Sequence, residues 1–427
     1  MFLSRILQLN VLNYSISKGN DLKKLFLIIV ISFVTNSFAQ EILIRSLQVY
    51  TSDDEKSFPV LTTKNQLVIE FDVQSSTLPV FNIVFRFCDR NWKPLDNIFF
   101  QNYGQNIAYF LDHFSLPVTV EEADYHFINR FPDKAGYVSF PFSGKWRFYV
   151  VDPQDTTKVY AQGKFIVANP EVLLNVELKK ETLEDKAYYP PELARSLWVI
   201  VKTTIPENLF PHFVDEVEIF RNHLVDYSLR INRNGPFNFN RKFEWDGSNN
   251  ITFIAKDFRP GNGYRQVNLM NTNTYSAKNV LAKFEGFESD RFYKNPLPDF
   301  NGGMIFYNHK DPYATYMNVK FSIKPSITIY GDVYLVGAFN DWKVLPEYKM
   351  EFDGELYTKT ILLKRGIYDY QYVVVNGDPD IPENIDWYIL EGNNWDAGNT
   401  LNVLLYYRDQ NYGGYDRLIG FSRIKTK

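Results

Sequence analysis

Apolar and polar residues alternate along most of the chain, which is the pattern of half-buried β-strands. In the segment 67–73, LVIEFDV, every odd position is apolar. The segments 145–150, 317–324 and 368–374 show the same period of two. Sustained helical periodicity is almost absent, and clusters of Pro, Gly, Asn and Asp separate the short runs. The pattern therefore predicts an all-β fold of tandem β-sandwich domains.

The spacing of the breaks predicts three domains. The first, residues 40–168, ends in a strand pair within GKWRFYVVDPQDTTKVYAQGKFIV, and the ANPEV that follows is a linker. The second, residues 169–312, closes with the Pro-, Gly- and Asn-rich YKNPLPDFNGGM. The third is residues 313–405, and we expect residues 406–427 to be an appended C-terminal arm.

Residues 1–39 have the pattern of a signal peptide. Lys23 and Lys24 precede the apolar run LFLIIVISFV, and the small residues Ser37 and Ala39 follow it. A run of this length is too short to cross a bilayer as a helix. We therefore expect cleavage after Ala39 and export of the chain.

Aromatic residues make up 17% of the chain, with 36 Phe and 29 Tyr. Such residues favour strands and large contact surfaces. Loss of residues 1–39 lowers Lys+Arg from 46 to 42 and Asp+Glu from 50 to 49, because it removes four cations and one Asp, so the net charge becomes −7. This charge and the absence of a basic block argue against nucleic acid or an anionic membrane as a partner.

A membrane-spanning barrel would show regular lipid-facing alternations of about ten residues. The strands predicted here are mostly shorter and prolines are frequent, so we expect the chain itself not to span the membrane.

The sequence offers little catalytic chemistry. It contains no nucleophile elbow, no phosphate-binding glycine loop and no dinucleotide-binding fingerprint. Cys88 is the only cysteine, and its neighbours Phe85, Phe87 and Trp92 predict packing as a small apolar residue. His113 and His126 would meet at a metal only if the fold supplied carboxylates, so we interpret them as ordinary loop or core residues. We expect no enzyme activity, no cofactor and no metal.

The segments DVYLVGAFNDWK (332–343) and LLKRGIYDYQYVVVNG (362–377) resemble early-set immunoglobulin-like domains, which include glycogen- and starch-binding modules. In the sugar-binding members, the tryptophan of this turn stacks on glucose. The resemblance places that role on Trp342, with Trp387 or Trp395 as the second ring. The lysine expected in the following hairpin falls at Gln371 or Tyr372, depending on register, so that cation is missing. A glycan-binding exported protein with an aromatic platform at Trp342 is therefore the alternative function. In relatives without sugar affinity, the same tryptophan caps the end of the sandwich instead.

Four other segments carry a second resemblance: FRFCDRNWKPL (85–95), YHFINRFP (125–132), SGKWRFYVVDP (143–153) and KDFRPGNGYRQV (256–267). With the C-terminal block, they resemble a Bacteroidetes family, formerly a domain of unknown function, that is linked to the plug subunit of the type IX secretion translocon. The resemblance spans about 41–405. Relatives are expected to carry a His before the Cys of the first segment, where this chain has Phe87.

The second resemblance implies a non-enzymatic periplasmic protein associated with the outer membrane. Such a plug docks on the large barrel protein of the translocon and closes its periplasmic opening. Aromatic side chains in two loops are candidate contacts with the barrel, although internal packing explains them equally well. These residues are Phe99, Phe100, Tyr103, Phe287, Phe292 and Tyr293.

Overall fold

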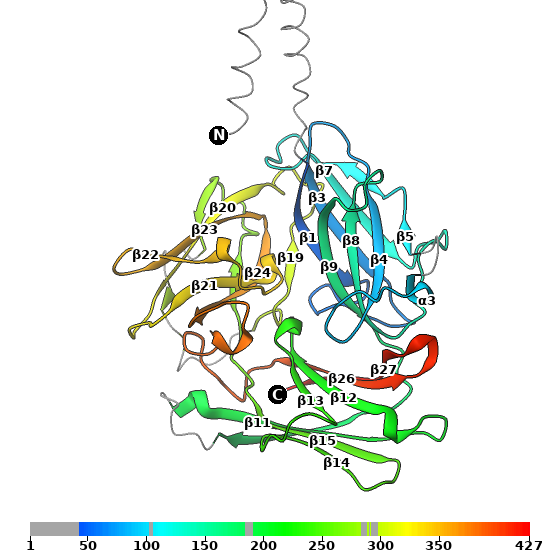
Figure 1. Cartoon of the computed structure of the whole chain (residues 1–427). Helices are drawn as coiled ribbons and strands as arrows, with labels where there is room; N and C mark the ends of the chain where they lie inside the picture. Colours follow the sequence, from blue (N-terminus) through cyan, green and yellow to red (C-terminus); the bar gives the residue numbers. More distant parts are fainter. Residues whose placement is uncertain (1–41, 102–105, 184–190, 283–287, 290, 292–297) are drawn as a thin grey trace, which may run out of the picture. The chain divides into compact units, whose positions relative to one another are not determined.

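The computed structural model describes residues 42–101, 106–183, 191–282, 288–289, 291 and 298–427. These residues are almost entirely strands and loops, with one four-residue helix, α3 (Ile98–Gln101), and several 3₁₀ turns. The all-β prediction is confirmed: six mostly antiparallel sheets of four or five strands form three sandwiches (Figure 1). No helix in the described residues is long and apolar enough to cross a bilayer. The predicted signal peptide lies outside the described ranges.

The first sandwich contains the segment whose alternation is clearest. One sheet has the order β1 (Leu43–Thr51), β3 (Leu67–Gln74), β7 (Tyr125–Phe131) and β6 (His113–Ser115). The other has the order β2 (Val60–Leu61), β9 (Val159–Val167), β8 (Gly144–Val151), β4 (Asn82–Cys88) and β5 (Ile107–Ala108). The odd positions of 67–73 point inward and join Trp146 and Phe165 in one aromatic-rich core. The period-2 pattern therefore predicted the buried face of β3 correctly.

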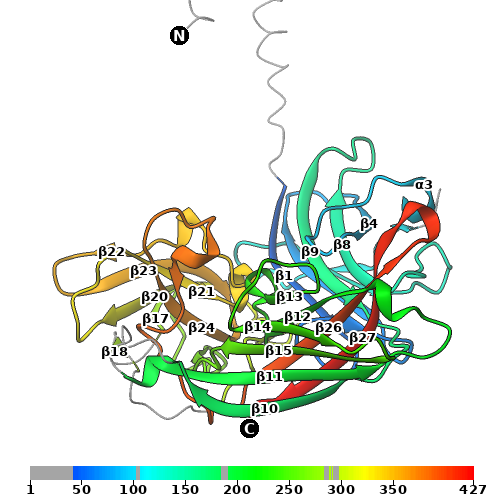
Figure 2. The ribbon, with the colours of Figure 1, turned by 60° about the horizontal axis from the view of Figure 1, so that its bottom comes forward.

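The middle sandwich combines segments that lie far apart in the sequence. One sheet has the order β10 (Asn175–Thr182), β11 (Arg195–Thr204), β15 (Asn250–Phe258) and β14 (Arg241–Trp245). The other has the order β13 (Leu229–Asn232), β12 (Val214–Arg221), β26 (Thr400–Asp409) and β27 (Tyr415–Lys425). Figure 2 shows the two sheets over one another, with β26 and β27 in orange to red and the other strands in green. One core joins them, in which Phe253 and Val403 are fully buried.

The third sandwich is built from residues between β15 and β26. One sheet has the order β16 (Arg265–Asn268), β24 (Gly366–Val375) and β19 (Met304–Phe306), and β21 (Asp332–Gly337) and β25 (Ile385–Asp386) also pair with β24. The other has the order β17 (Asn279–Leu281), β20 (Tyr316–Lys324), β23 (Tyr357–Lys364) and β22 (Glu351–Phe352), and β18 (Glu288–Ser289) also pairs with β20. Phe321 and Tyr370 pack edge to face in its core, with ring centroids 4.9 Å apart.

The strand pairing differs from the predicted boundaries at 312 and 405. β16 to β19 precede residue 313 but belong to the third sandwich, and β26 and β27 complete the middle one. Residues 406–427 are not a separate arm, because β27 pairs with β26 along its length from Tyr415 to Lys425. The physical reason lies in β12, whose eight residues are all buried. A buried strand needs hydrogen-bond partners on both sides, and β26 is the second partner of β12.

This topology makes the C-terminal hairpin part of the core. Leu418 on β27 is 0% exposed, whereas Leu173 is 91% exposed. We expect Leu418→Ala to lower the free energy of unfolding by about 2–5 kcal/mol, because it opens a cavity. The matched variant Leu173→Ala should change it by no more than about 0.5 kcal/mol. Urea unfolding measures both values, and equal stability of the two variants would contradict the assignment of β27 to the core.

Candidate functional site

The turn after β21 directs its tryptophan into the protein. The side-chain oxygen of Asn340 accepts the backbone N–H of Gly337 at 3.0 Å, and the backbone N–H of Trp342 donates to the Gly337 carbonyl at 3.0 Å. Asp341 and Trp342 both adopt positive φ, 53° and 60°. The indole is 1% exposed, and its Nε1–H donates to the carbonyl of Gly302 at 2.8 Å. Trp342 therefore packs inside the fold and presents no free ring face.

Of the other residues of the predicted sugar platform, Trp387 and Gln371 are buried and Trp395 is half-buried. Trp387 is 7% exposed and packs against Tyr227 with ring centroids 4.6 Å apart, and Gln371 is 4% exposed. Trp395 packs against the core of the middle sandwich, where its Nε1–H donates to the carbonyl of Ser196 at 2.8 Å. Stacking on a sugar requires an exposed ring, so the expectation of a platform at Trp342 is corrected to a packing role.

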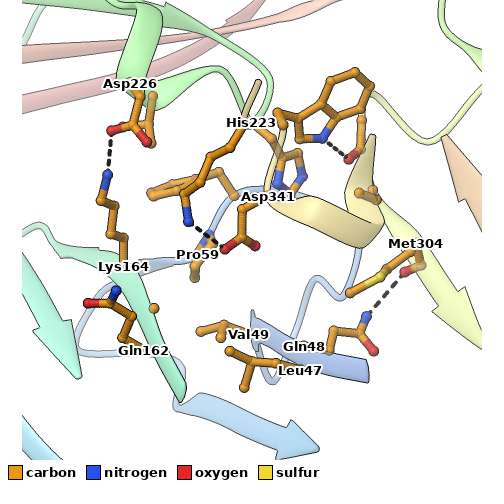
Figure 3. A pocket seen from close by; sticks show the side chains of 18 of the residues that line it. Leu47, Gln48, Val49, Pro59, Gln162, Lys164, His223, Asp226, Met304 and Asp341 are labelled. Carbon is orange, nitrogen blue, oxygen red and sulfur yellow. Dashed lines mark hydrogen bonds and ion pairs between the residues drawn. The ribbon is translucent and has the colours of Figure 1, made fainter. Parts of the chain in front are cut away.

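A cavity of about 80 Å³ lies beside Trp342, with lining residues from all three sandwiches (Figure 3). Gln48 from the first sandwich donates from Nε2 to the carbonyl of Met304 at 3.1 Å. Lys164 from the first sandwich forms an ion pair with Asp226. Pockets for small-molecule ligands usually enclose about 300–1,000 Å³. This cavity is too small to be such a pocket.

Asp369 fixes the loop that carries the hydrogen-bond acceptor of Trp342. One of its oxygens, Oδ2, accepts the backbone N–H groups of Phe300 at 2.7 Å and Gly302 at 2.9 Å. Its other oxygen accepts the amide of Gln266 at 2.9 Å. Burial, and then the nearby Asp299 carboxylate, raise the pKa of Asp369 to about 7. The charge of this side chain therefore bears on the geometry of the Trp342 site.

A buried ion pair joins the first sandwich to the middle one. Nζ of Lys145 on β8 lies 2.9 Å from Oε1 of Glu218 on β12, and both side chains are 0% exposed. Glu218 also accepts the hydroxyl of Tyr406 on β26 at 3.0 Å. Burial lowers the pKa of the Lys145 ammonium despite the carboxylate beside it. Removing either partner would leave a buried charge unpaired.

Arg90, in the loop after β4, forms a second group of ion pairs across the same boundary. Its guanidinium pairs with Asp215, lies 3.2 Å from Oε2 of Glu216, and lies 2.9 Å from Oδ1 of Asp416. Three carboxylates from β12 and β27 thus surround one cation from the first sandwich.

Another buried polar cluster joins the first sandwich to the third. Asp72 on β3 accepts hydrogen bonds from the hydroxyl of Tyr316 at 2.7 Å and from Nζ of Lys364 at 2.5 Å. Its Oδ1 lies 2.7 Å from Nδ1 of His126 on β7. Burial raises the pKa of Asp72, but the hydrogen bond with His126 and the charge of Lys364 outweigh this effect and lower it. Asp72 therefore stays ionised between the two sandwiches.

Glu70 and His309 extend this cluster. Oε2 of Glu70 lies 3.4 Å from Nε2 of His126 and 3.9 Å from Nε2 of His309. Burial, followed by the charge of Lys364, lowers the pKa of His309 to about 3. His113 does not take part, because it pairs with Phe127 on the opposite face of the sheet. The sequence did not indicate the meeting of His126 and His309, which are far apart along the chain.

The predicted aromatic contacts divide into three groups. Phe99 is 57% exposed and contacts Tyr412 at a ring distance of 5.5 Å, so it remains a candidate contact. Phe100 is 2% exposed and stacks on Phe87, which makes it an internal packing residue. The others lie outside the described residues: Tyr103, Phe287, Phe292 and Tyr293.

A more exposed aromatic pair was not predicted from the sequence. Phe237 and Phe239, between β13 and β14, are 81% and 77% exposed, and their ring centroids are 4.8 Å apart. The signal for this pair is PFNFN, an alternation of Phe with Asn and Pro in a loop. Cys88, by contrast, behaves as predicted: it is 1% exposed, and burial raises the pKa of its thiol to about 12. A protonated, buried thiol is not a nucleophile.

Comparison with known protein families identifies the first sandwich. Residues 44–169 match the family model described as Type 9 secretion system plug protein 1st domain. The resemblance that the sequence carries is thus confirmed over this segment. The match covers the whole predicted first domain except its first few residues, including the segments 85–95, 125–132 and 143–153.

A solved structure resembles the fold of this chain well beyond residues 44–169. A crystal structure of a hypothetical protein from Parabacteroides merdae is similar with a TM-score of 0.72 and 20% sequence identity, over 90% of this chain and 98% of that one. The two chains therefore share a fold. A bacterial ice-binding adhesin aligns over 89% of this chain and 96% of its own at 10% identity, but with a TM-score of 0.13, which supports no conclusion. No curated protein matches the sequence.

The packing of Trp342 predicts a loss of stability when its ring is removed. We expect Trp342→Ala to lower the free energy of unfolding by about 3–5 kcal/mol, since it empties a buried site. Tyr330 is 84% exposed, so Tyr330→Ala should change it by no more than about 0.5 kcal/mol. Urea unfolding tests both. On an amylose column the wild-type chain should not be retained, and retention that Trp342→Ala abolishes without unfolding would contradict the packing role.

The raised pKa of Asp369 predicts a pH-dependent contribution to stability. A carboxyl group with a raised folded-state pKa stabilises the fold below its unfolded pKa, near 4, and this stabilisation is lost as the pH rises through about 7. Asp369→Asn keeps a neutral side chain, so between pH 4 and 8 the wild type should lose up to about 4 kcal/mol relative to this variant. Urea unfolding across this range measures the difference. The exposed control Asp380→Asn should follow the wild type, and a constant difference between wild type and Asp369→Asn would disprove the role of this charge.

Proposed function

We propose that this chain is a non-enzymatic plug or accessory subunit of the type IX secretion system. It docks on the large outer-membrane barrel protein of the translocon from the periplasmic side and closes the opening. The observation that carries the proposal is the match of residues 44–169 to the first domain of plug proteins. The predicted signal peptide supports a location in the periplasm, in association with the outer membrane.

The internal packing suits such a role, because a stopper must resist deformation while it blocks an opening. The Lys145–Glu218 pair ties the first sandwich to the middle one, and the Asp72 cluster ties it to the third. Loss of either partner would leave a buried charge unpaired, so each ion pair fixes the position of one sandwich against the other. Residues 42–427 form one compact unit, and in this proposal the unit closes the opening sterically.

The exposed aromatic side chain of Phe99 is the candidate contact that lies within the family-matching segment. Aromatic side chains are enriched in protein–protein interfaces, and Phe99 packs beside Tyr412, which is 47% exposed, so the two rings form a small exposed aromatic patch. Release of the plug would then require only a difference in its affinity for empty and cargo-loaded translocon. The sugar-binding alternative is not proposed, since the ring of Trp342 is buried.

The proposal is tested by affinity capture. The tagged chain, expressed with its own leader, is purified from detergent-solubilised outer membranes, and every co-eluting protein is identified by mass spectrometry. One very large barrel protein should dominate. Deletion of the gene should also make the outer membrane permeable to antibiotics that are normally too large to enter, because the opening is no longer closed. A chain that elutes alone, with no change in permeability, would rule out the plug role.

Two exposed phenylalanines provide a matched pair of variants for the same capture. Phe99 is 57% exposed and lies inside the family-matching segment, whereas Phe352 is 55% exposed and lies outside it. We expect Phe99→Ser to reduce the recovery of the barrel protein at least several-fold and Phe352→Ser to leave it unchanged. Equal recovery with both variants would exclude Phe99 as a contact without excluding the plug role.

A further inference from the structure

Two histidines and one glutamate converge where the first sandwich meets the third. Glu70 lies on β3, His126 on the neighbouring β7, and His309 in the loop after β19. One donor atom of each residue lies within 4.8 Å of the donor atoms of the other two. Oε2 of Glu70 is 3.4 Å from Nε2 of His126 and 3.9 Å from Nε2 of His309. A tetrahedral ion about 2 Å from each donor holds its ligands about 3.3 Å apart, so these side chains need only a small inward movement.

The donor types narrow the class of ion. Two imidazole nitrogens and one carboxylate oxygen suit Zn²⁺ and related first-row transition-metal ions. Ca²⁺ and Mg²⁺ prefer sites made of oxygen atoms alone. The charge of the cluster also favours a cation, because Lys364 pairs with Asp72, whereas the carboxylate of Glu70 faces the two histidines.

The groups behind the histidines orient them as ligands. Oδ1 of Asp72 lies 2.7 Å from Nδ1 of His126, which places the proton of that ring on Nδ1 and turns the lone pair of Nε2 toward Glu70. A carboxylate in this position is the usual support of a metal-bound histidine. Nζ of Lys364 lies 2.7 Å from Nδ1 of His309 and holds that ring from behind. For His309 to bind through Nε2, its Nδ1 must carry the ring proton, so the ammonium group of Lys364 must turn away from Nδ1 while it keeps its hydrogen bond to Asp72.

The position of the cluster gives an ion both a route in and a structural effect. The side chain of His309 is 18% exposed, whereas those of Glu70 and His126 are 5% and 2% exposed. An ion can therefore enter past His309 and end beside two buried ligands. Because these ligands belong to β3 and β7 and His309 belongs to the third sandwich, the ion would connect the two sandwiches.

We propose that Glu70, His126 and His309 bind one Zn²⁺ or similar transition-metal ion, which fastens the third sandwich to the first. A water molecule fills the fourth coordination position. This site does not depend on the proposed plug role. The alternative is a network without an ion, in which a charged His126 pairs with the carboxylates of Glu70 and Asp72. Such a network would not bind added Zn²⁺.

The experiment uses the chain purified from cells that express the complete sequence, treated with a chelator and then freed of it. Isothermal titration with Zn²⁺ should show one ion per chain, and the thermal unfolding midpoint should rise in the presence of Zn²⁺. Co²⁺ should produce the visible absorption of a four-coordinate site. His309→Gln should weaken Zn²⁺ binding at least tenfold and remove the rise in the midpoint. The matched control His113→Gln, on the opposite sheet face, should bind as the wild type does.

Three results would overturn the proposal. They are no uptake of Zn²⁺ or Co²⁺ by the wild type, equal uptake by His309→Gln, and an equal loss of binding in His113→Gln. Unfolding of each variant in chelator shows whether the fold is intact. If His309→Gln does not fold, Glu70→Gln takes its place, because it keeps the side-chain shape and removes the charge. Weaker binding by Glu70→Gln supports the site, and unchanged binding excludes it.

Discussion

Asp72 shows the constraint on which the arrangement of the sandwiches depends, namely that a charge removed from water must be paired. It lies on the polar face of β3 and is 0% exposed. Two of its partners, Tyr316 and Lys364, belong to the third sandwich. The polar face of the first sandwich is therefore satisfied only when the third is in place. Lys145 imposes the same condition on the middle sandwich through Glu218.

The sequence predicted the strands better than their partners. Alternation in the segment 67–73 identified β3 and its apolar face, because that face follows from the local period of two. It could not show that the opposite face, with Glu70 and Asp72, is also buried, since the covering residues come from the third sandwich. The domain boundaries failed for a related reason. β12 pairs with β26, although all the strands of the third sandwich lie between them in the sequence, and a local pattern cannot indicate a pairing over such a distance.

The same distinction between local features and long-range contacts applies to the candidate sites. The motif around Trp342 correctly indicated a tight turn, but the exposure of the ring depends on Tyr264 and Gly302, which come from earlier segments of the chain. His126 and His309 each looked unremarkable in the sequence, and only the fold brings their ring centroids to 4.0 Å. The family resemblance succeeded for residues 44–169 because whole motifs, and not single residues, carried it.

The return of the chain to the middle sandwich has a consequence for the order of folding. Synthesis proceeds from the N-terminus, so β12 and β13 emerge long before β26 and β27. Until the last segment arrives, β12 has one side without hydrogen-bond partners, and the apolar side chains of Val217 and Ile219 lack part of their core. The third sandwich has all its strands earlier, because they lie between β15 and β26 in the chain. The middle sandwich is therefore the last to close, because its second sheet is complete only when the C-terminal hairpin is available.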